Sequence, residues 1–156
     1  MDKITEHSPK RLIVVDAVDA LAQELFGDKY DYDMTTTLYD PLEVFEQQDK
    51  PKWVTILGDE ASELHDLGGT IVNTVLINGQ IFAKVPSNNL AHAMPYLQDI
   101  DVLKKELIGQ MIEYKGHVIY GNVQSEEHPA WSTFHDIDLT GKILRIQFAI
   151  LLRIHD

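Results

Sequence analysis

The chain has 156 residues, is 44% hydrophobic, contains no cysteine and carries a formal net charge of −12. This length supports one compact domain with its own core, so a single domain over residues 1–156 is expected. The composition excludes disulfides and cysteine-based chemistry, no apolar run reaches the length of a membrane span, and the acidic balance argues against a surface that follows nucleic-acid phosphates.

The first predicted element is a helix from about Pro9 to Phe26. Ser8 can cap the free amide groups of its first turn, and Pro9 suits the first helical position because it has no amide proton to satisfy. Apolar residues then recur at helical spacing on one stripe. Gly27 ends the helix, since glycine readily adopts the conformation found just past a helix end.

The region after this helix is predicted to hold short strands separated by polar loops. In chain order we expect a turn-rich segment, a short strand, a loop, a β-rich strand and an acidic loop at residues 28–40, 42–45, 46–52, 53–57 and 58–69. Pro51 lies at the end of the first loop, where a proline does not disturb the hydrogen bonds of a central strand.

The stretch from Thr70 to Val85 favours β-structure and has Asn78-Gly79 at its middle. Asn-Gly is the strongest short signal for a two-residue hairpin turn. Two interpretations therefore compete, a tight hairpin of residues 71–77 with 80–85, or one long strand with a bulge at Gly79. The residues alone favour the hairpin.

A second helix is predicted from Pro86 to about Ile108, with Pro95 as a candidate break. A strand at His117–Val123 follows, and then a polar loop at Gln124–Asp138 that contains Trp131. A tryptophan is out of place in a solvated loop. We expect it either to fold back into the core or to anchor a contact with another chain, because tryptophan buries a large area at low entropic cost.

The last predicted element is a long strand within the segment from Gly141 to Asp156. Apolar side chains there share one parity, at residues 144, 146, 148, 150, 152 and 154. Only a period of two places all six on one face, so the pattern predicts a β-strand. At about 3.3 Å per residue it spans roughly 40 Å, about twice the common strand length. We therefore expect a sheet that continues into a neighbouring copy, paired through Gly141–Ile154.

The order of the predicted elements is helix, strands, helix, strands, with strands outnumbering helices. This order predicts an α+β fold in which two helices cover one face of a largely antiparallel sheet.

Catalytic and metal chemistry have weak support in the sequence. The chain has no nucleophile elbow and no phosphate-binding glycine loop. A metal site is conceivable from His117, His128, His135, Asp136 and Asp138, and Glu126-Glu127-His128 could offer acid–base groups, but neither spacing follows a known motif. A solvated acidic loop is the favoured interpretation of both sets. We expect no enzyme, no catalytic residue, no cofactor and no metal.

Several short segments occur in an order that carries a family resemblance. They are Arg11–Leu21, Glu43-Val44-Phe45, Asp49-Lys50-Pro51 leading into Trp53–Leu57, the acidic segment 58–69, Val85-Pro86-Ser87, Gln98-Asp99-Ile100, Trp131-Ser132 and the alternating C-terminal strand. In this order they resemble the tail terminator proteins of lambda-like long-tailed bacteriophages. The chain departs from that pattern by extra residues at 27–37 and 113–127, and by an Asn78-Gly79 pair inside what should be one long strand.

The resemblance implies a structural virion protein without enzymatic activity. It implies a homohexameric ring that binds the end of the finished tail tube, stops its growth and offers a joining surface to the connector and neck proteins. A sheath or its terminal ring would be a further partner in a contractile tail, and the genomic DNA would pass through the lumen without specific binding. The expected location is the head-proximal end of the virion tail, with assembly in the host cytoplasm and no membrane partner. Six copies at −12 each would carry a formal charge of −72, which repels DNA.

The candidate contact residues follow from this interpretation. The loops 46–52 and 58–69 are expected to make axial contacts, and the final strand to make lateral contacts. The candidates are Asp49, Lys50, Asp59, Glu60, Glu63, Trp131, Arg145, Phe148 and Arg153. Replacing Trp131 by Ala, or placing a charge at Phe148, should impair ring formation or folding.

Three other functions remain open from the sequence. Another neck protein, for head completion or connector joining, would also form a ring. A small cytosolic α+β enzyme should show a deep pocket with converging polar groups. A generic acidic adaptor should be monomeric.

Overall fold

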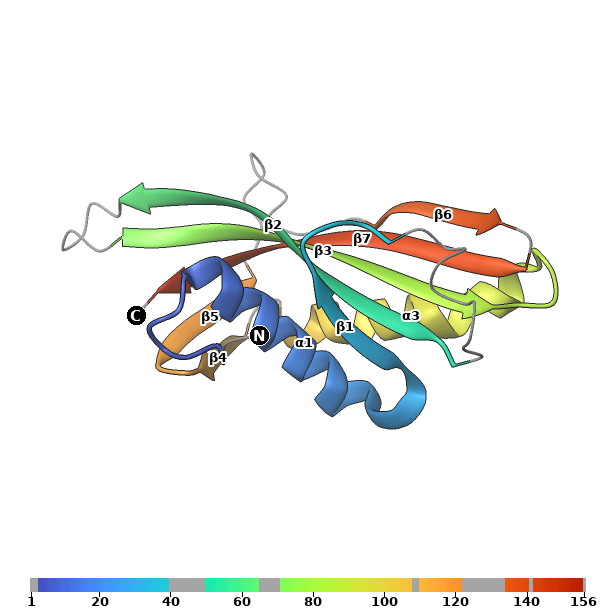
Figure 1. The fold of residues 1–156 in the computed structure, drawn as a ribbon, viewed down its shortest axis with the longest axis horizontal. Helices are drawn as coiled ribbons and strands as arrows, with labels where there is room; N and C mark the ends of the chain where they lie inside the picture. The colour runs from blue at the N-terminus through green and yellow to red at the C-terminus, as the bar shows by residue number, and fades with distance from the viewer. Residues whose placement is uncertain are drawn as a thin grey trace.

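The computed structural model describes residues 3–39, 50–64, 71–107, 110–121, 134–140 and 142–155, and gives the backbone alone at 59–64, 71–72, 134–136, 138 and 140. In these residues two α-helices and a 3₁₀ turn accompany a seven-stranded sheet (Figure 1). The elements are α1 (Lys10–Phe26), η1 (Gly27–Lys29), β1 (Asp31–Thr35), β2 (Lys52–Leu64), β3 (Ile71–Lys84), α3 (Leu90–Leu107), β4 (Met111–Tyr114), β5 (His117–Gly121), β6 (Phe134–Thr140) and β7 (Ile143–His155).

The sheet has the order β1-β2-β3-β7-β5-β4, and β6 pairs with β7 beside β5. Only β1 and β2 run parallel, and every other described pairing is antiparallel. Residues from α1, α3 and the central strands share one buried apolar cluster, so both helices cover the same face of the sheet (Figure 1). The predicted α+β fold is confirmed.

Strand β7 is the centre of this sheet. Its predicted alternation is confirmed, because the six apolar residues from Leu144 to Ile154 are all buried. The expectation that β7 pairs with a neighbouring copy is wrong. β3 pairs with it from Ile143 to Ile154 on one side, and β6 and β5 occupy most of its other side. A strand whose hydrogen-bonding groups are used within the subunit cannot extend the sheet outward.

The predicted hairpin at Asn78-Gly79 is also wrong. Strand β3 continues through Gly79, which pairs with Thr55 of β2 and Phe148 of β7 without a break in register. A Cβ atom added at Gly79 would lie 2.2 Å from Cζ of Phe148. The glycine therefore makes room for the ring of Phe148 and does not form a turn. The bulge lies on β2, between Leu57 and Glu60.

Four segments predicted as loop or left unassigned are strands. Residues 58–64, predicted as an acidic loop, continue β2 because residues 60–64 pair with 71–75 of β3. The turn-rich segment after α1 contains β1, and the polar loop before the last strand contains β6 from residue 134 onward. β4, which was not predicted, pairs with β5. The predicted strand at 42–45, most of the loop 46–52, residues 65–69 and residues 124–133 lie outside the described residues.

Both predicted helices are confirmed, with different starts. α1 begins at Lys10, and Ser8 does not cap it, since the Oγ atom of Ser8 accepts the amide of Thr5. Gly27 ends α1 as expected, at a φ of 54°. α3 begins at Leu90 and includes Pro95 without a break in the helix.

A second, smaller cluster lies on the face of the sheet that the helices leave open. It consists of Val54, Ile56 and Phe82, with Tyr39 and Ile143 packed against it. The chain after β1 crosses this face, where the amide of Tyr39 donates to Oε1 of Gln80 at 2.9 Å. This segment therefore covers part of the face opposite the helices.

Candidate functional site

The candidate contact residues do not all lie on one surface. Lys50 is exposed just before β2, and Asp59, Glu60 and Glu63 lie on the distal half of β2. Asp49 and Trp131 lie outside the described residues. Lys50 therefore lies outside the strands, as the predicted loop 46–52 required, whereas the three acidic residues belong to a strand and not to a loop.

The three candidates on β7 are divided between its two faces. Arg145 and Arg153 are half-buried and share the parity opposite to the core residues, which places them on the helix-free face. Phe148 is 1% exposed and lies in the core against Trp53, with ring centroids 5.3 Å apart. Its side chain is therefore part of the core and not of the subunit surface, and a charge there acts first on folding.

Among the residues that the structure describes, the distal half of β2 forms an open sheet edge. β1 pairs only with residues 52–56, so beyond Ile56 no strand among the described residues adjoins the outer side of β2. At Gly58, where the strand bulges, the guanidinium of Arg11 donates from Nε to the carbonyl oxygen at 2.9 Å. An added Cβ at Gly58 would lie 1.9 Å from the carbonyl oxygen of Leu76, so this close approach requires glycine. Arg11 therefore satisfies a backbone carbonyl of β2 just beyond the residues that pair with β1.

A groove of about 370 Å³ lies where this edge begins. Its walls are mainly apolar side chains of the N-terminal segment, α1, the end of β1 and β2, with threonines at the rim. The lining residues are Ile4, Leu12, Val15, Met34, Thr35, Thr36, Thr37, Tyr39 and Leu57. Its mainly apolar lining suits contact with an apolar surface.

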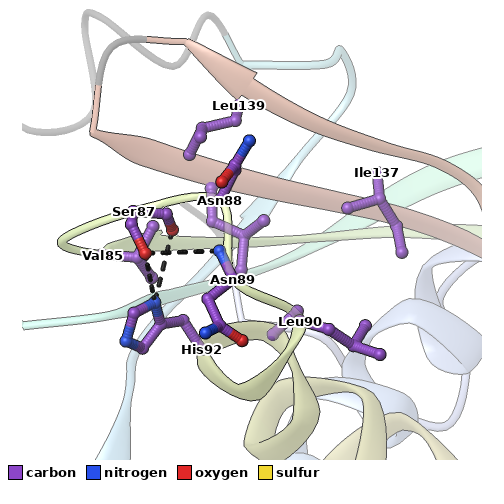
Figure 2. A pocket seen from close by; sticks show the side chains of 10 residues that line it. Val85, Ser87, Asn88, Asn89, Leu90, His92, Ile137 and Leu139 are labelled. Atoms are coloured by element: carbon purple, nitrogen blue, oxygen red, sulfur yellow. Dashed lines mark hydrogen bonds between the residues drawn. The ribbon is translucent and has the colours of Figure 1, made fainter.

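A second pocket, of about 200 Å³, lies between the start of α3 and β6 (Figure 2). Its polar rim contains a serine–histidine pair, Oγ of Ser87 and Nδ1 of His92, at 3.2 Å. The same Oγ accepts the amide of Asn89, and Oδ1 of Asn89 accepts the amide of Ala91 at 3.0 Å. These bonds fix the turn into α3 and satisfy its first amide groups, as capping residues do.

One carboxyl group is buried away from both pockets. Asp19 on α1 is 5% exposed, and its Oδ2 accepts a hydrogen bond from Nε2 of Gln23 at 2.7 Å, while Oδ1 has no hydrogen-bond partner among the described residues. Burial raises the pKa of this carboxyl to about 6, against the lowering effect of Gln23. Nearby Asp16 and Asp33 add a smaller increase in the pKa.

A polar network joins the start of β1 to α3. Asp99 accepts a hydrogen bond from the hydroxyl of Tyr30 and pairs with Nζ of Lys29 at 2.5 Å. Tyr30 is almost fully buried, and burial, then the Asp99 carboxylate, raises the pKa of its phenol. The tyrosine therefore stays neutral and acts as a donor, which is a structural role.

The metal-site hypothesis is not supported by the placement of its residues. His117 on β5 lies near the His155 end of β7, and its Nε2 lies 2.9 Å from the carbonyl oxygen of Glu6. Asp136 on β6 pairs opposite Gln147, eight residues or roughly 26 Å away along β7. No group of three residues that could hold a metal occurs in the described part of the chain.

No protein-family model matches the chain, and no curated protein matches it. Among the described residues no helix has the length and apolar character needed to cross a membrane. Interpretation of function therefore rests on the residues and the geometry above.

Proposed function

We propose that this chain is the subunit of a ring, most simply a hexamer, that caps the tail tube of a long-tailed phage and joins it to the neck. The proposal rests on the ordered resemblance to tail terminator proteins together with the shape of the sheet. Asp49 and Trp131, two of the residues in that resemblance, keep the roles proposed from the sequence.

The observation that carries the proposal is the length of the central strands relative to the helices. β2, β3 and β7 contain 13, 14 and 13 residues, or roughly 43–46 Å of strand. α1 contains 17 residues and spans about 26 Å. The distal ends of β2 and β3 consequently project past α1 (Figure 1). A sheet that extends beyond its covering helices offers edges for association with other chains.

A ring of this kind can stop growth of the tail tube because its two axial faces differ. A contact repeated around a rotation axis uses two different faces of each subunit and closes into a ring. The ring then stops growth if one axial face fits the tube and the other rejects a further tube ring. Six copies with a net charge of −12 each would also repel the DNA that passes through.

The test is a tube-growth assay with the phage's own tail-tube protein. Adding the purified, gold-labelled chain during polymerisation should shorten the tubes and place label at one end only, in electron micrographs. A Phe148→Asp variant, which should not fold, serves as the inactive control. Tubes of unchanged length, or label along their sides, would contradict the proposal. Label that appears only on isolated connectors would favour a different neck ring.

A further inference from the structure

In the described part of the chain the sheet has a second open edge, opposite the first. β4 is the last strand beside β5, and no described strand adjoins its outer side. Ile112 and Tyr114 pack against the main core, whereas Met111 on the opposite parity is 73% exposed. This is a large exposure for an apolar side chain, and it lies on an unpaired strand.

The β4–β5 hairpin is held firmly in place. Lys115 and Gly116 form its two-residue turn, at φ values of 48° and 79°, as a type I′ turn requires. Nζ of Lys115 pairs with Oδ2 of Asp16 at 2.7 Å, and the hydroxyl of Tyr114 donates to the same oxygen. A strand fixed in this way loses little further entropy when it pairs with a partner.

The two open edges differ in charge. Residues 57–64 of β2 include Asp59, Glu60 and Glu63 and no basic residue. Pairing this edge with the same edge of another copy would bring six carboxylates together, which is unfavourable. Residues 111–117 of the β4–β5 hairpin carry one acidic residue, Glu113, and one basic residue, Lys115. The acidic edge therefore meets the hairpin edge with less repulsion than it meets a second copy of itself.

The surroundings of the β2 edge also suit an added strand. The apolar groove lies where the edge begins, so a strand there would cover surface that β1 leaves open. Leu38, in the segment that crosses the helix-free face, is 52% exposed. Met111 lies on the parity opposite to the core, and therefore faces the helix-free side as well. In a sheet continued between copies these two apolar residues would share a face.

We propose that β4 of one copy adds to the open edge of β2 in the next copy, beyond Ile56, and so continues the sheet around the ring. This inference rests on the proposed function, because it names the surfaces that join ring subunits. The contact is heterologous, since each copy presents β4 on one side and β2 on the other, and repetition of such a contact about a single rotation axis closes a ring. Backbone hydrogen bonds would supply affinity, and the Met111–Leu38 contact would supply register.

Disulfide trapping tests the pairing. Because the chain contains no cysteine, only the introduced thiols can form cross-links. The variant Leu38→Cys/Met111→Cys is oxidised at high protein concentration and compared with Val102→Cys/Met111→Cys. Val102 is 41% exposed on α3 and lies on neither edge. The first pair should give about tenfold more cross-linked oligomer, because pairing raises the effective concentration of the two thiols. The Leu38→Cys/Met111→Cys variant should also form cross-linked oligomers larger than the dimer.

Two results overturn the inference. One is equal cross-linking of the two double variants. The other is efficient dimer formation by Leu38→Cys alone, which means that the β2 edge pairs with itself. As a second measurement, Met111→Asp should weaken capping in the tube assay, while Val102→Asp, also at an exposed apolar position, should not.

The trapping and tube experiments fail in distinguishable ways. If the wild-type chain caps tubes but the Leu38/Met111 pair does not cross-link on them, the surface assignment is wrong and the proposed function stands. If the pair cross-links into a closed series but the chain leaves tube growth unchanged, the edge pairing stands and the proposed function is wrong.

Discussion

At the scale of single residues, Asp19 carries the clearest energetic consequence. Its pKa is raised from 3.8 to about 6 in the folded chain. The folded state therefore binds a proton more tightly than the unfolded state, and the stabilisation by protonation is complete below pH 4. It is lost as the pH rises through 6, so stability falls across this window.

Replacing Asp19 by Asn should therefore stabilise the protein at neutral pH. The amide oxygen still accepts the bond from Gln23, and the cost of a buried charge is removed. We expect the free energy of unfolding at pH 7.5 to rise by about 1–2 kcal/mol, with no gain at pH 4. Urea unfolding at both pH values measures this. Asp28→Asn, at an exposed site, is the control, and an equal gain in both variants would contradict the role of burial.

Gly79 gives a second prediction at this scale. Substitution by Ala would normally favour a strand interior, but here the new methyl group meets the ring of Phe148. We expect a loss of about 1–3 kcal/mol in the free energy of unfolding, as overpacked cores show. Gly79→Ala/Phe148→Leu should recover part of this loss, measured against Phe148→Leu alone. Strictly additive effects of the two substitutions would show that the ring contact is not the cause.

Some of these residue roles were readable from the sequence and others were not. Asp19 lies four residues after Val15 and three before Ala22, on the buried stripe of α1, so helical periodicity could have identified it. Gly79 could not be interpreted in the same way. Its neighbour Phe148 is 69 positions away, and the local Asn-Gly signal indicates a turn unless that contact is known.

At the scale of elements, long periodic segments were predictable and short ones were not. The alternation in β7 and the stripe of α1 are strong because many residues repeat one pattern. β1 and β6 are polar in sequence and form strands because β2 and β7 offer them partners. The distal part of β2 is similar, since its acidic residues suit a loop and only pairing with β3 extends it.

The β4–β5 hairpin was missed because its turn is Lys-Gly and not Asn-Gly. It also ties down the N-terminal segment, since Nζ of Lys115 donates to the carbonyl oxygen of Ile4 at 2.7 Å. Lys115→Met should remove this bond and the pair with Asp16. We expect faster amide hydrogen exchange at residues 4–8, with Lys105→Met, at an exposed site of α3, as the control. Unchanged exchange in this segment would show that other contacts hold it.

At the scale of the whole molecule, the class of fold was predictable and the arrangement of edges was not. The order of helices and strands indicated two helices on one face of the sheet. Strand order depends on contacts between distant segments, and nothing local in β7 shows that it lies between β3 on one side and β5 and β6 on the other. The lateral contact is therefore proposed at β2 and β4, and not at β7 as the sequence predicted.

The central position of β7 also bears on how the protein is made. On the ribosome β1, β2 and β3 emerge first, and β4 and β5 follow, yet the two groups have no described contact through the sheet until β7 is synthesised between them. The sheet can therefore close only after β7 has been synthesised, through contacts between distant parts of the chain, which slows folding. Nascent chains that lack β7 would leave β3 and β5 as exposed, aggregation-prone edges, and chaperones that shield such intermediates should raise the yield of the protein.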